Sequence, residues 1–238
     1  MNQDIKLALL IDGDNINSRY IRALTEEIAN YGTPTIRRIY GDWTKPHLNA
    51  WKDVLLKNAI TPIQQYSYTS GKNATDSAMI IDAMDVLYAG QVDGFCLVSS
   101  DSDFTRLATR IREAGKKVYG MGEKKTPEPF IVACDKFIYL EVLKGDEDPK
   151  AEKKVKSDKI TDDVLRLLKN SVASAAGEDG WAFMGDVGSL ILKKQPDFDP
   201  RNFGFEKLTP LFSSTGKFGI EERNKDNTRF KLIYVKNL

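Results

Sequence analysis

Histidine and cysteine are nearly absent from this chain of 238 residues. With His47 as the single histidine, hydrolysis by a pair of histidines is excluded, and we expect His47 to lie at the surface. The two cysteines, Cys96 and Cys134, are too few for a disulfide framework. Neither shows the spacing of a zinc or redox site, so we expect both to be small buried hydrophobic residues.

Long apolar runs and the common nucleotide-binding glycine patterns are also missing. No window approaches the roughly 18 consecutive apolar residues that a membrane span needs, and the chain shows neither a P-loop nor the glycine pattern of a dinucleotide site. Its first residues lack the basic stretch and apolar core of a secretory signal. We therefore expect a cytoplasmic protein without a membrane partner.

The first 143 residues alternate between short apolar runs and helical patterns. Apolar residues spaced three and four apart indicate the helices, and such alternation is typical of βα units that form a parallel sheet. This predicts an α/β, Rossmann-like fold with helices on both faces of the sheet. The expected strands are 6–11, 35–40, 61–65, 94–98, 117–120 and 137–140, and the expected helices are 16–30, 47–58, 74–88, 104–114 and 128–134.

A highly charged segment separates this part from the rest of the chain. Eleven of the sixteen residues 144–159 are charged, so the segment can bury almost nothing. We expect a domain at 1–143, a linker at 144–157 and a small domain at 158–238. The latter shows three helical patterns, at 160–171, 184–194 and 205–212, and two alternating strands, at 218–222 and 229–235. Three helices and a hairpin describe a winged helix.

Two of the predicted strands end in acidic residues. Leu7–Ile11 is followed by Asp12, Gly13, Asp14 and Asn15, and Phe95–Val98 is followed by Ser99, Ser100, Asp101, Ser102 and Asp103. The carboxyl ends of parallel strands share one edge of a sheet, where ligands bind. Carboxylates that converge there repel one another unless a cation such as Mg²⁺ is coordinated between them. The alternative is that Asp14, Asn15 or Asp103 only caps the following helix.

A third acidic residue, Asp76, opens the predicted helix 74–88. An aspartate in the first turn is favourable against the helix dipole whatever its function, so the spacing alone leaves a ligand and a dipole partner equally open. Asp82 is six residues further on, about 120° around the helix. We expect it to support the site or the fold rather than to share an ion with Asp76.

Three motifs, in this order and spacing, resemble the NYN domain, a branch of the PIN-like metal-dependent ribonucleases. They are Leu-Leu-Ile-Asp-Gly-Asp-Asn at 9–15, Lys-Asn-Ala-Thr-Asp at 72–76 with Ile-Ile-Asp-Ala-Met at 80–84, and Val-Ser-Ser-Asp-Ser-Asp-Phe at 98–104. The resemblance implies Mg²⁺ or Mn²⁺ and cleavage of single-stranded RNA. It implies catalytic metal ligands at Asp12, Asp76, Asp101 and Asp103, with Asn15 near the site. We expect Asp14 and Asp82 as supporting residues beside these ligands.

The tail resembles a LOTUS domain, also called OST-HTH, a small winged helix associated with RNA. The segments that carry the resemblance are 178–181, 186–190, 203–208 and the closing hairpin. We expect Trp181, Phe203, Phe205, Leu208 and Phe212 in its core. Because Lys and Arg supply the affinity for a polyanion, the candidate RNA contacts are Arg37, Arg38, Lys72, Lys124, Lys193, Lys194, Lys207, Arg223, Lys225 and Arg229.

The sequence therefore predicts a Mg²⁺- or Mn²⁺-dependent ribonuclease whose tail domain binds RNA. Water would attack phosphorus in line and leave 5′-phosphate and 3′-hydroxyl ends. Two alternatives stay open. One is an RNA-binding regulator without catalysis, and the other is a haloacid-dehalogenase-type phosphatase that uses Asp12 and Asp14.

Overall fold

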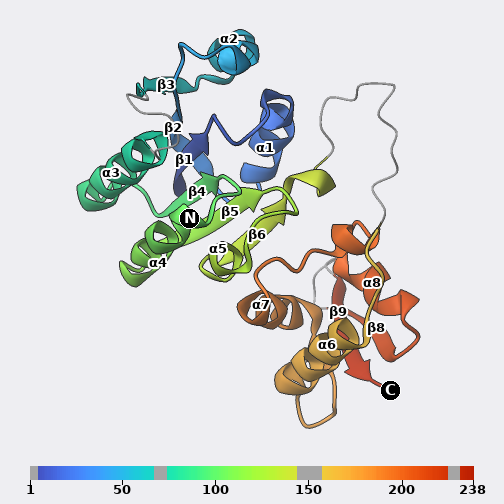
Figure 1. The fold of residues 1–238 in the computed structure, drawn as a ribbon. Helices are drawn as coiled ribbons and strands as arrows, with labels where there is room; N and C mark the ends of the chain where they lie inside the picture. The colour runs from blue at the N-terminus through green and yellow to red at the C-terminus, as the bar shows by residue number, and fades with distance from the viewer. Residues whose placement is uncertain (1–4, 67–73, 144–156, 225–230) are drawn as a thin grey trace. The chain divides into compact units, whose positions relative to one another are not determined.

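The computed structural model describes residues 5–66, 74–143, 157–224 and 231–238 of the chain. It divides into two compact units, residues 1–153 and 154–238 (Figure 1). Most of the predicted linker, 144–156, lies outside the described residues. Within these described ranges, no helix is long and apolar enough to cross a membrane.

The first unit contains a six-stranded sheet whose paired strands are all parallel. Its strand order is β3-β2-β1-β4-β5-β6. The order reverses between β1 and β4, the topological switch point of a doubly wound sheet. The strands are β1 (Lys6–Asp12), β2 (Thr33–Gly41), β3 (Thr61–Gln64), β4 (Gly94–Val98), β5 (Lys117–Gly122) and β6 (Lys136–Tyr139).

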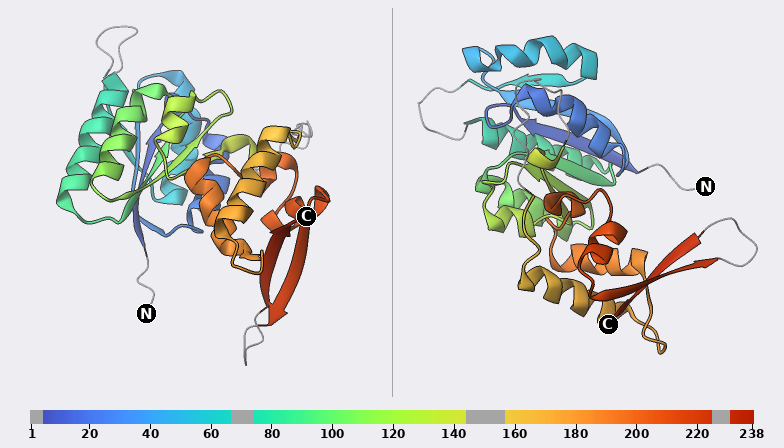
Figure 2. Two further views of the ribbon diagram at one scale, coloured as in Figure 1. Left: turned by 90° about the horizontal axis from the view of Figure 1, so that it is seen from below. Right: turned by 90° about the vertical axis from the view of Figure 1, so that its right-hand side faces the viewer.

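Helices cover both faces of this sheet, as Figures 1 and 2 show. One layer contains α1 (Ile21–Ile28) and α2 (Asn49–Leu55). The other contains α3 (Ala74–Ala89), α4 (Thr105–Glu113) and α5 (Glu128–Val132). Short 3-10 turns extend several of them: η1 (Ser18–Tyr20), η2 (Pro46–Leu48), η3 (Leu56–Asn58), η4 (Ser102–Phe104) and η5 (Leu140–Val142).

The side chains of β1 show why this strand is a continuous apolar run. Leu7, Leu9 and Ile11 pack in the core on the side of α1 and α2, while Ala8 and Leu10 pack against α3, α4 and α5. A parallel strand covered on both faces needs apolar residues at every position. Cys96 and Cys134 are free and buried in these two cores, as predicted.

The second unit has three helices, α6 (Asp162–Ala175), α7 (Met184–Lys194) and α8 (Leu208–Ser214), and a 3-10 turn η6 (Pro200–Phe203). Its antiparallel sheet has the order β7-β9-β8, with β7 (Ala182–Phe183), β8 (Phe218–Asn224) and β9 (Lys231–Asn237). This is the winged-helix arrangement that the sequence predicts, and Figure 2 shows its long hairpin.

The core of the second unit differs from the expected one at Trp181. Phe212 is fully buried, and Phe203, Phe205 and Leu208 are partly buried against the core. Trp181 instead lies beside the cations Arg223 and Lys236, outside the core cluster. The prediction for Trp181 was wrong because aromatic residues serve both cores and surfaces, and a single position carries no periodicity that separates the two.

Candidate metal centre

The acidic segments meet at the carboxyl edge of the sheet, next to the switch point between β1 and β4. Asp12 is the last residue of β1, and Asp101 and Asp103 follow β4 around the turn η4. Asp76 lies in the first turn of α3. Segments almost ninety residues apart therefore contribute to one site, as the parallel pairing of β1 with β4 requires.

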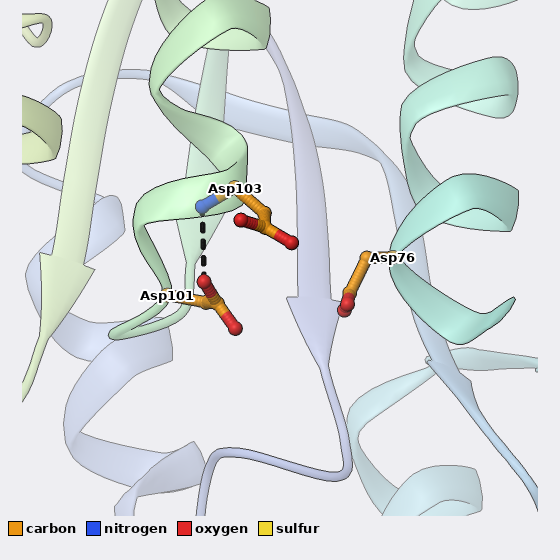
Figure 3. Close-up of side chains that lie close together, drawn as sticks. All are labelled: Asp76, Asp101 and Asp103. Atoms are coloured by element: carbon orange, nitrogen blue, oxygen red, sulfur yellow. Dashed lines mark hydrogen bonds between the residues drawn. The ribbon is translucent and has the colours of Figure 1, made fainter. Parts of the chain in front are cut away.

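Three of these side chains form a compact group, which we call the aspartate triad: Asp76, Asp101 and Asp103. One carboxylate oxygen from each lies within 4.8 Å of those of the other two. Figure 3 shows the three carboxyl groups between the turn after β4 and the first turn of α3. Three oxygen donors at such spacing can hold one divalent cation of the hard class to which Mg²⁺ and Mn²⁺ belong.

The turn after β4 is held by its own hydrogen bonds. Asp101 is the N-cap of η4, and its Oδ1 accepts from the backbone N–H of Asp103 at 2.9 Å (Figure 3). The capping role considered for Asp103 thus belongs to Asp101. One oxygen of Asp101 organises the turn, and its carboxyl group still belongs to the triad.

Asp12 lies next to the triad but is not one of its members. It is only 3% exposed, and its Oδ2 accepts from the Ser99 hydroxyl at 2.7 Å. Its Oδ1 is buried and has no hydrogen-bond partner among the described residues. A buried carboxylate oxygen without a donor is costly in a metal-free protein, and it is the kind of atom that a cation would satisfy.

Gly13 allows the backbone to pass close to β2 at this point. Its N–H donates to the carbonyl of Tyr40 at 2.8 Å. A Cβ at position 13 would lie 2.8 Å from the same oxygen, closer than side-chain carbons normally approach. Glycine is therefore needed for the backbone to pass so close to β2.

The electrostatics of the site follow from burial and mutual repulsion. Burial is the largest cause that raises the pKa of Asp12 from 3.8 to about 7, and the charges of Asp76 and Asp14 also raise it. The hydrogen bond from Ser99 lowers this pKa and so acts in the opposite direction. Burial also raises the pKa of Asp76 to about 6, together with the charges of Asp101, Asp103 and Asp14. Without a cation, both groups hold protons at pH values where an ordinary aspartate is ionised.

Asp14 bonds to two side chains that the sequence did not identify as part of the site. Its Oδ1 is 2.9 Å from Nε2 of His47, and its Oδ2 accepts from the Thr75 hydroxyl at 2.9 Å. Neither Asp14 nor Asn15 caps the following turn, because Asn17 does so by accepting from the N–H of Arg19. Asn15 keeps its Oδ1 buried without a partner among the described residues.

Asp82 serves the fold on the side of α3 that faces β2. It accepts from the Arg38 guanidinium and from the Tyr40 hydroxyl, and so ties the helix to the strand. Arg37 donates to the carbonyls of Pro34 and Asn58 at 3.1 and 3.0 Å. The RNA contacts predicted for Arg37 and Arg38 therefore compete with these hydrogen bonds within the protein.

The other predicted RNA contacts are distributed over both units. Lys124 follows β5, and its backbone N–H donates to Glu141 at 2.8 Å. Lys193 and Lys194 end α7, where Lys194 donates to Ser171 at 3.3 Å, and Lys207 precedes α8. Arg223 lies on β8 between acidic and aromatic side chains. Lys72, Lys225 and Arg229 lie outside the described residues.

Ser99 links the two acidic segments. Its fully buried hydroxyl donates to Asp12 and accepts from the backbone N–H of Asp101 at 3.1 Å. The sequence alone does not identify this role, because a serine between a strand and two aspartates is a common arrangement in capping turns.

We expect Ser99→Ala to lower the affinity for Mn²⁺ by about tenfold, because Asp12 loses the donor that favours its charged form and the turn after β4 loses its anchor. Isothermal titration with MnCl₂ measures the effect, with the exposed Ser102→Ala as the matched control. Equal affinities for the two variants would contradict the role given to Ser99.

Comparison with known proteins assigns both units. The NYN domain model matches residues 6–141, and the OST-HTH/LOTUS domain model matches residues 156–230. An uncharacterized protein of Methanocaldococcus jannaschii, MJ0482, is 27% identical over 122 residues, which cover 49% of this chain and 47% of that protein. The match thus spans about half the length of that relative.

Two solved structures are similar to parts of the chain. A protein of unknown function from Vibrio parahaemolyticus, VPA0982, is 22% identical with a TM-score of 0.47 and covers 58% of this chain and 93% of its own. An uncharacterized protein from gene locus NE0665 of Nitrosomonas europaea is 26% identical with a TM-score of 0.32 and covers 40% of this chain and 90% of its own. By the match of residues 6–141, more than half of its length, the chain belongs to the NYN domain family of the PIN-like nuclease superfamily, and an OST-HTH/LOTUS domain follows.

Proposed function

We propose that this protein is a Mg²⁺- or Mn²⁺-dependent ribonuclease that hydrolyses phosphodiesters of single-stranded RNA and binds its substrate partly through the second unit. The observation that carries the proposal is the aspartate triad at the switch point of an NYN fold. Family membership supports a nuclease-like chemistry, and the OST-HTH/LOTUS domain supports RNA as the partner.

In this proposal, Asp76, Asp101 and Asp103 hold the cation, and Asp12 contributes its buried Oδ1 from the end of β1. When bound, the cation supplies charge stabilisation for the phosphoryl group and activates water for in-line attack. Ser99 fixes Asp12 and the turn that carries Asp101, and Asp14 accepts a hydrogen bond from Thr75 beside Asp76, in both cases without touching the ion. Asn15 stays a predicted neighbour of the site. Asp82 acts only through the fold, by fixing α3 on β2.

The proposed reaction is a hydrolysis, and its metal ligands have to be ionised near neutral pH. Attack of water forms a bond from its oxygen to phosphorus and breaks the bond from phosphorus to the 3′ oxygen. The water loses a proton and the departing 3′ oxygen gains one, which leaves 5′-phosphate and 3′-hydroxyl ends. In the metal-free protein the pKa values of Asp12 and Asp76 are raised to about 7 and about 6, so both carboxyl groups must lose their protons before they bind a cation. Cation binding displaces those protons, so the affinity for the metal rises with pH across the same interval.

The test is cleavage of an end-labelled single-stranded RNA by the full chain in MnCl₂ or in EDTA, beside the double variant Asp12→Asn/Asp101→Asn. We expect cleavage only by the unmodified protein with Mn²⁺. Equal cleavage by both proteins would show a contaminating nuclease. No cleavage by either, with retained RNA binding, would favour the second candidate, an RNA-binding regulator that keeps the acidic group as a scaffold. Turnover of small phosphate monoesters would support the phosphatase instead.

A further inference from the structure

The three-stranded sheet of the second unit has one face in the core and one face outside it. The helices of this unit pack on the inner face, which presents Ile220, Ile233 and Val235. Successive side chains on a strand point to opposite faces. The opposite set includes Gly219, Glu221 and Leu232 together with five aromatic and basic residues, which we call the aromatic face: Trp181, Phe183, Arg223, Tyr234 and Lys236.

The composition of this face is unusual for its position. An antiparallel sheet with one face outside the core normally presents polar residues there. Here three aromatic rings and two cations stand side by side, and Phe183 is 36% exposed. Packing inside the unit does not account for the rings, because the core lies on the other side of the strands.

The side chains of the aromatic face form a continuous row. The guanidinium carbon of Arg223 lies 4.4 Å from the ring centroid of Tyr234 and 5.3 Å from that of Trp181. Nζ of Lys236 lies 4.8 Å from the Trp181 centroid. The rings of Phe183 and Tyr234 are 5.9 Å apart, tilted by 56°. A guanidinium plane thus lies near two rings, the geometry of cation–π and stacking contacts.

Neighbouring groups hold this row in place. Arg223 donates N–H groups to Glu221 and Asp179 at 3.3 and 3.4 Å, and these bonds hold its guanidinium beside the rings. A backbone hydrogen bond from Trp181, the largest cause, and the charge of Arg223 lower the pKa of the Asp179 carboxyl. Rings that are already ordered lose little conformational freedom when a ligand stacks on them.

Two glycines make room for the outer side chains. A Cβ on Gly185 would lie 2.6 Å from the Phe183 ring, and a Cβ on Gly219 would lie 3.2 Å from the stem of Lys236. The Phe183 ring therefore lies close to the backbone of α7, and the Lys236 stem lies close to the backbone of β8. A larger residue at either position would displace the side chain beside it.

The chemistry of the face selects the class of ligand. Asp179 and Glu221 offset the charge of Arg223, so the face is poorly suited to bind phosphate by charge alone. It offers planar stacking surfaces, with the ammonium of Lys236 beside them to meet a negative backbone. Unpaired nucleobases on a phosphate chain combine planar faces with negative charge, whereas a duplex hides the faces of its bases.

We propose that Trp181, Phe183, Tyr234, Arg223 and Lys236 form a stacking surface for unpaired bases of single-stranded RNA. The inference rests on the proposed function in one respect, since it takes RNA to be the substrate. The stacking surface specifies where that RNA is bound, and it selects single strands because only unpaired bases expose their planar faces. Stacking on rings tolerates different bases, so the surface binds with little sequence preference.

The test measures binding of a fluorescently labelled twelve-nucleotide oligo(A) RNA to the full chain in EDTA, where the proposed cleavage is suppressed. We expect Trp181→Ala and Tyr234→Ala each to weaken binding by about tenfold or more, read as fluorescence anisotropy. Tyr88→Ala removes an exposed ring from α3 of the first unit and is the matched control, with a change below about twofold. Binding of inorganic polyphosphate of equal charge is measured beside it. Polyphosphate has no bases, so weaker binding of polyphosphate than of oligo(A) shows that stacking, and not charge alone, holds the RNA.

A second measurement keeps the proposal falsifiable if an alanine variant fails to fold. Oligo(A) stacked on Trp181 quenches its fluorescence, so Trp181→Phe should bind RNA but lose that component of the quenching. Unchanged affinity in both alanine variants, or equal binding of polyphosphate and oligo(A), would overturn the proposal and leave the face to a protein partner. Binding of oligo(A) that depends on Trp181 and Tyr234, without Mn²⁺-dependent cleavage, would contradict the nuclease function alone and leave the stacking surface supported.

Discussion

Asp76→Asn is expected to lower the rate of Mn²⁺-dependent RNA cleavage by at least about a hundredfold. Asp76 is the member of the aspartate triad that also neighbours Asp12, since the charge of Asp76 raises the pKa of Asp12. An amide at this position removes one negative ligand from the group. Loss of a ligand weakens both the affinity for the cation and the charge stabilisation of the reaction. Single-turnover cleavage of labelled RNA over a range of MnCl₂ concentrations measures the effect.

The chain offers a close control for this variant. Asp85 lies on the same helix nine residues further on and outside the triad, so Asp85→Asn changes the net charge equally without removing a ligand. Its cleavage rate should stay within about twofold of the unmodified protein. Mn²⁺ should raise the melting temperature of Asp85→Asn but not of Asp76→Asn, because a ligand that binds only the folded state stabilises it. An undiminished thermal shift in Asp76→Asn would contradict the assignment of the metal centre.

Asp12→Asn is expected to stabilise the metal-free protein at pH 7 while it impairs catalysis. Burial raises the pKa of Asp12 from 3.8 to about 7, so the folded chain binds a proton that the unfolded chain has released. Below about pH 4, Asp12 is protonated in both states and costs the folded state little. As pH rises towards 7, this cost grows and the free energy of unfolding of the protein falls. The amide of the variant carries no such charge, and the gain at pH 7 is about 3–4 kcal/mol as an upper value.

Urea unfolding in EDTA between pH 4 and pH 8 measures this prediction. In a Trp181→Phe background, the remaining tryptophans Trp43 and Trp51 both pack in the first unit, so their fluorescence follows that unit. The stability difference between Asp12→Asn and its parent should be near zero at pH 4 and grow up to pH 7. A difference independent of pH would mean that Asp12 is ionised in the folded metal-free protein. With saturating Mn²⁺ the order should reverse, because only the parent keeps the full ligand set.

These two variants separate the roles of neighbouring aspartates. Both should impair cleavage, but Asp12 lies in the interior and Asp76 is only half-buried at a helix N-terminus. The stabilising effect should therefore be larger for Asp12→Asn than for Asp76→Asn, because the pKa of Asp76 is raised less, to about 6. Loss of a favourable charge against the helix dipole further reduces the effect of Asp76→Asn. Buried carboxyl groups at the metal centre therefore lower the stability of the metal-free protein, and the same groups provide the affinity for the cation.

Local patterns in the sequence determined the elements of both units. Six strands and the helices between them lie within a few residues of their predicted positions, and so do the three helices and the hairpin of the winged helix. Periodicity reveals them because it reflects burial: β1 is apolar at every position since helices cover both faces of its sheet. The expected parallel sheet also predicted that the two acidic segments lie at one edge, and the parallel pairing of β1 with β4 confirms it.

Only the tertiary structure decided how individual side chains are shared between cap, core and site. Asp101 rather than Asp103 caps the turn after β4, Asp12 lies beside the triad with a serine as its donor, and Trp181 joins cations on the outer face of a sheet. Each outcome depends on the distance and direction of groups far away in the sequence. Periodicity records which positions are buried, but it carries no information on which distant side chain supplies the partner.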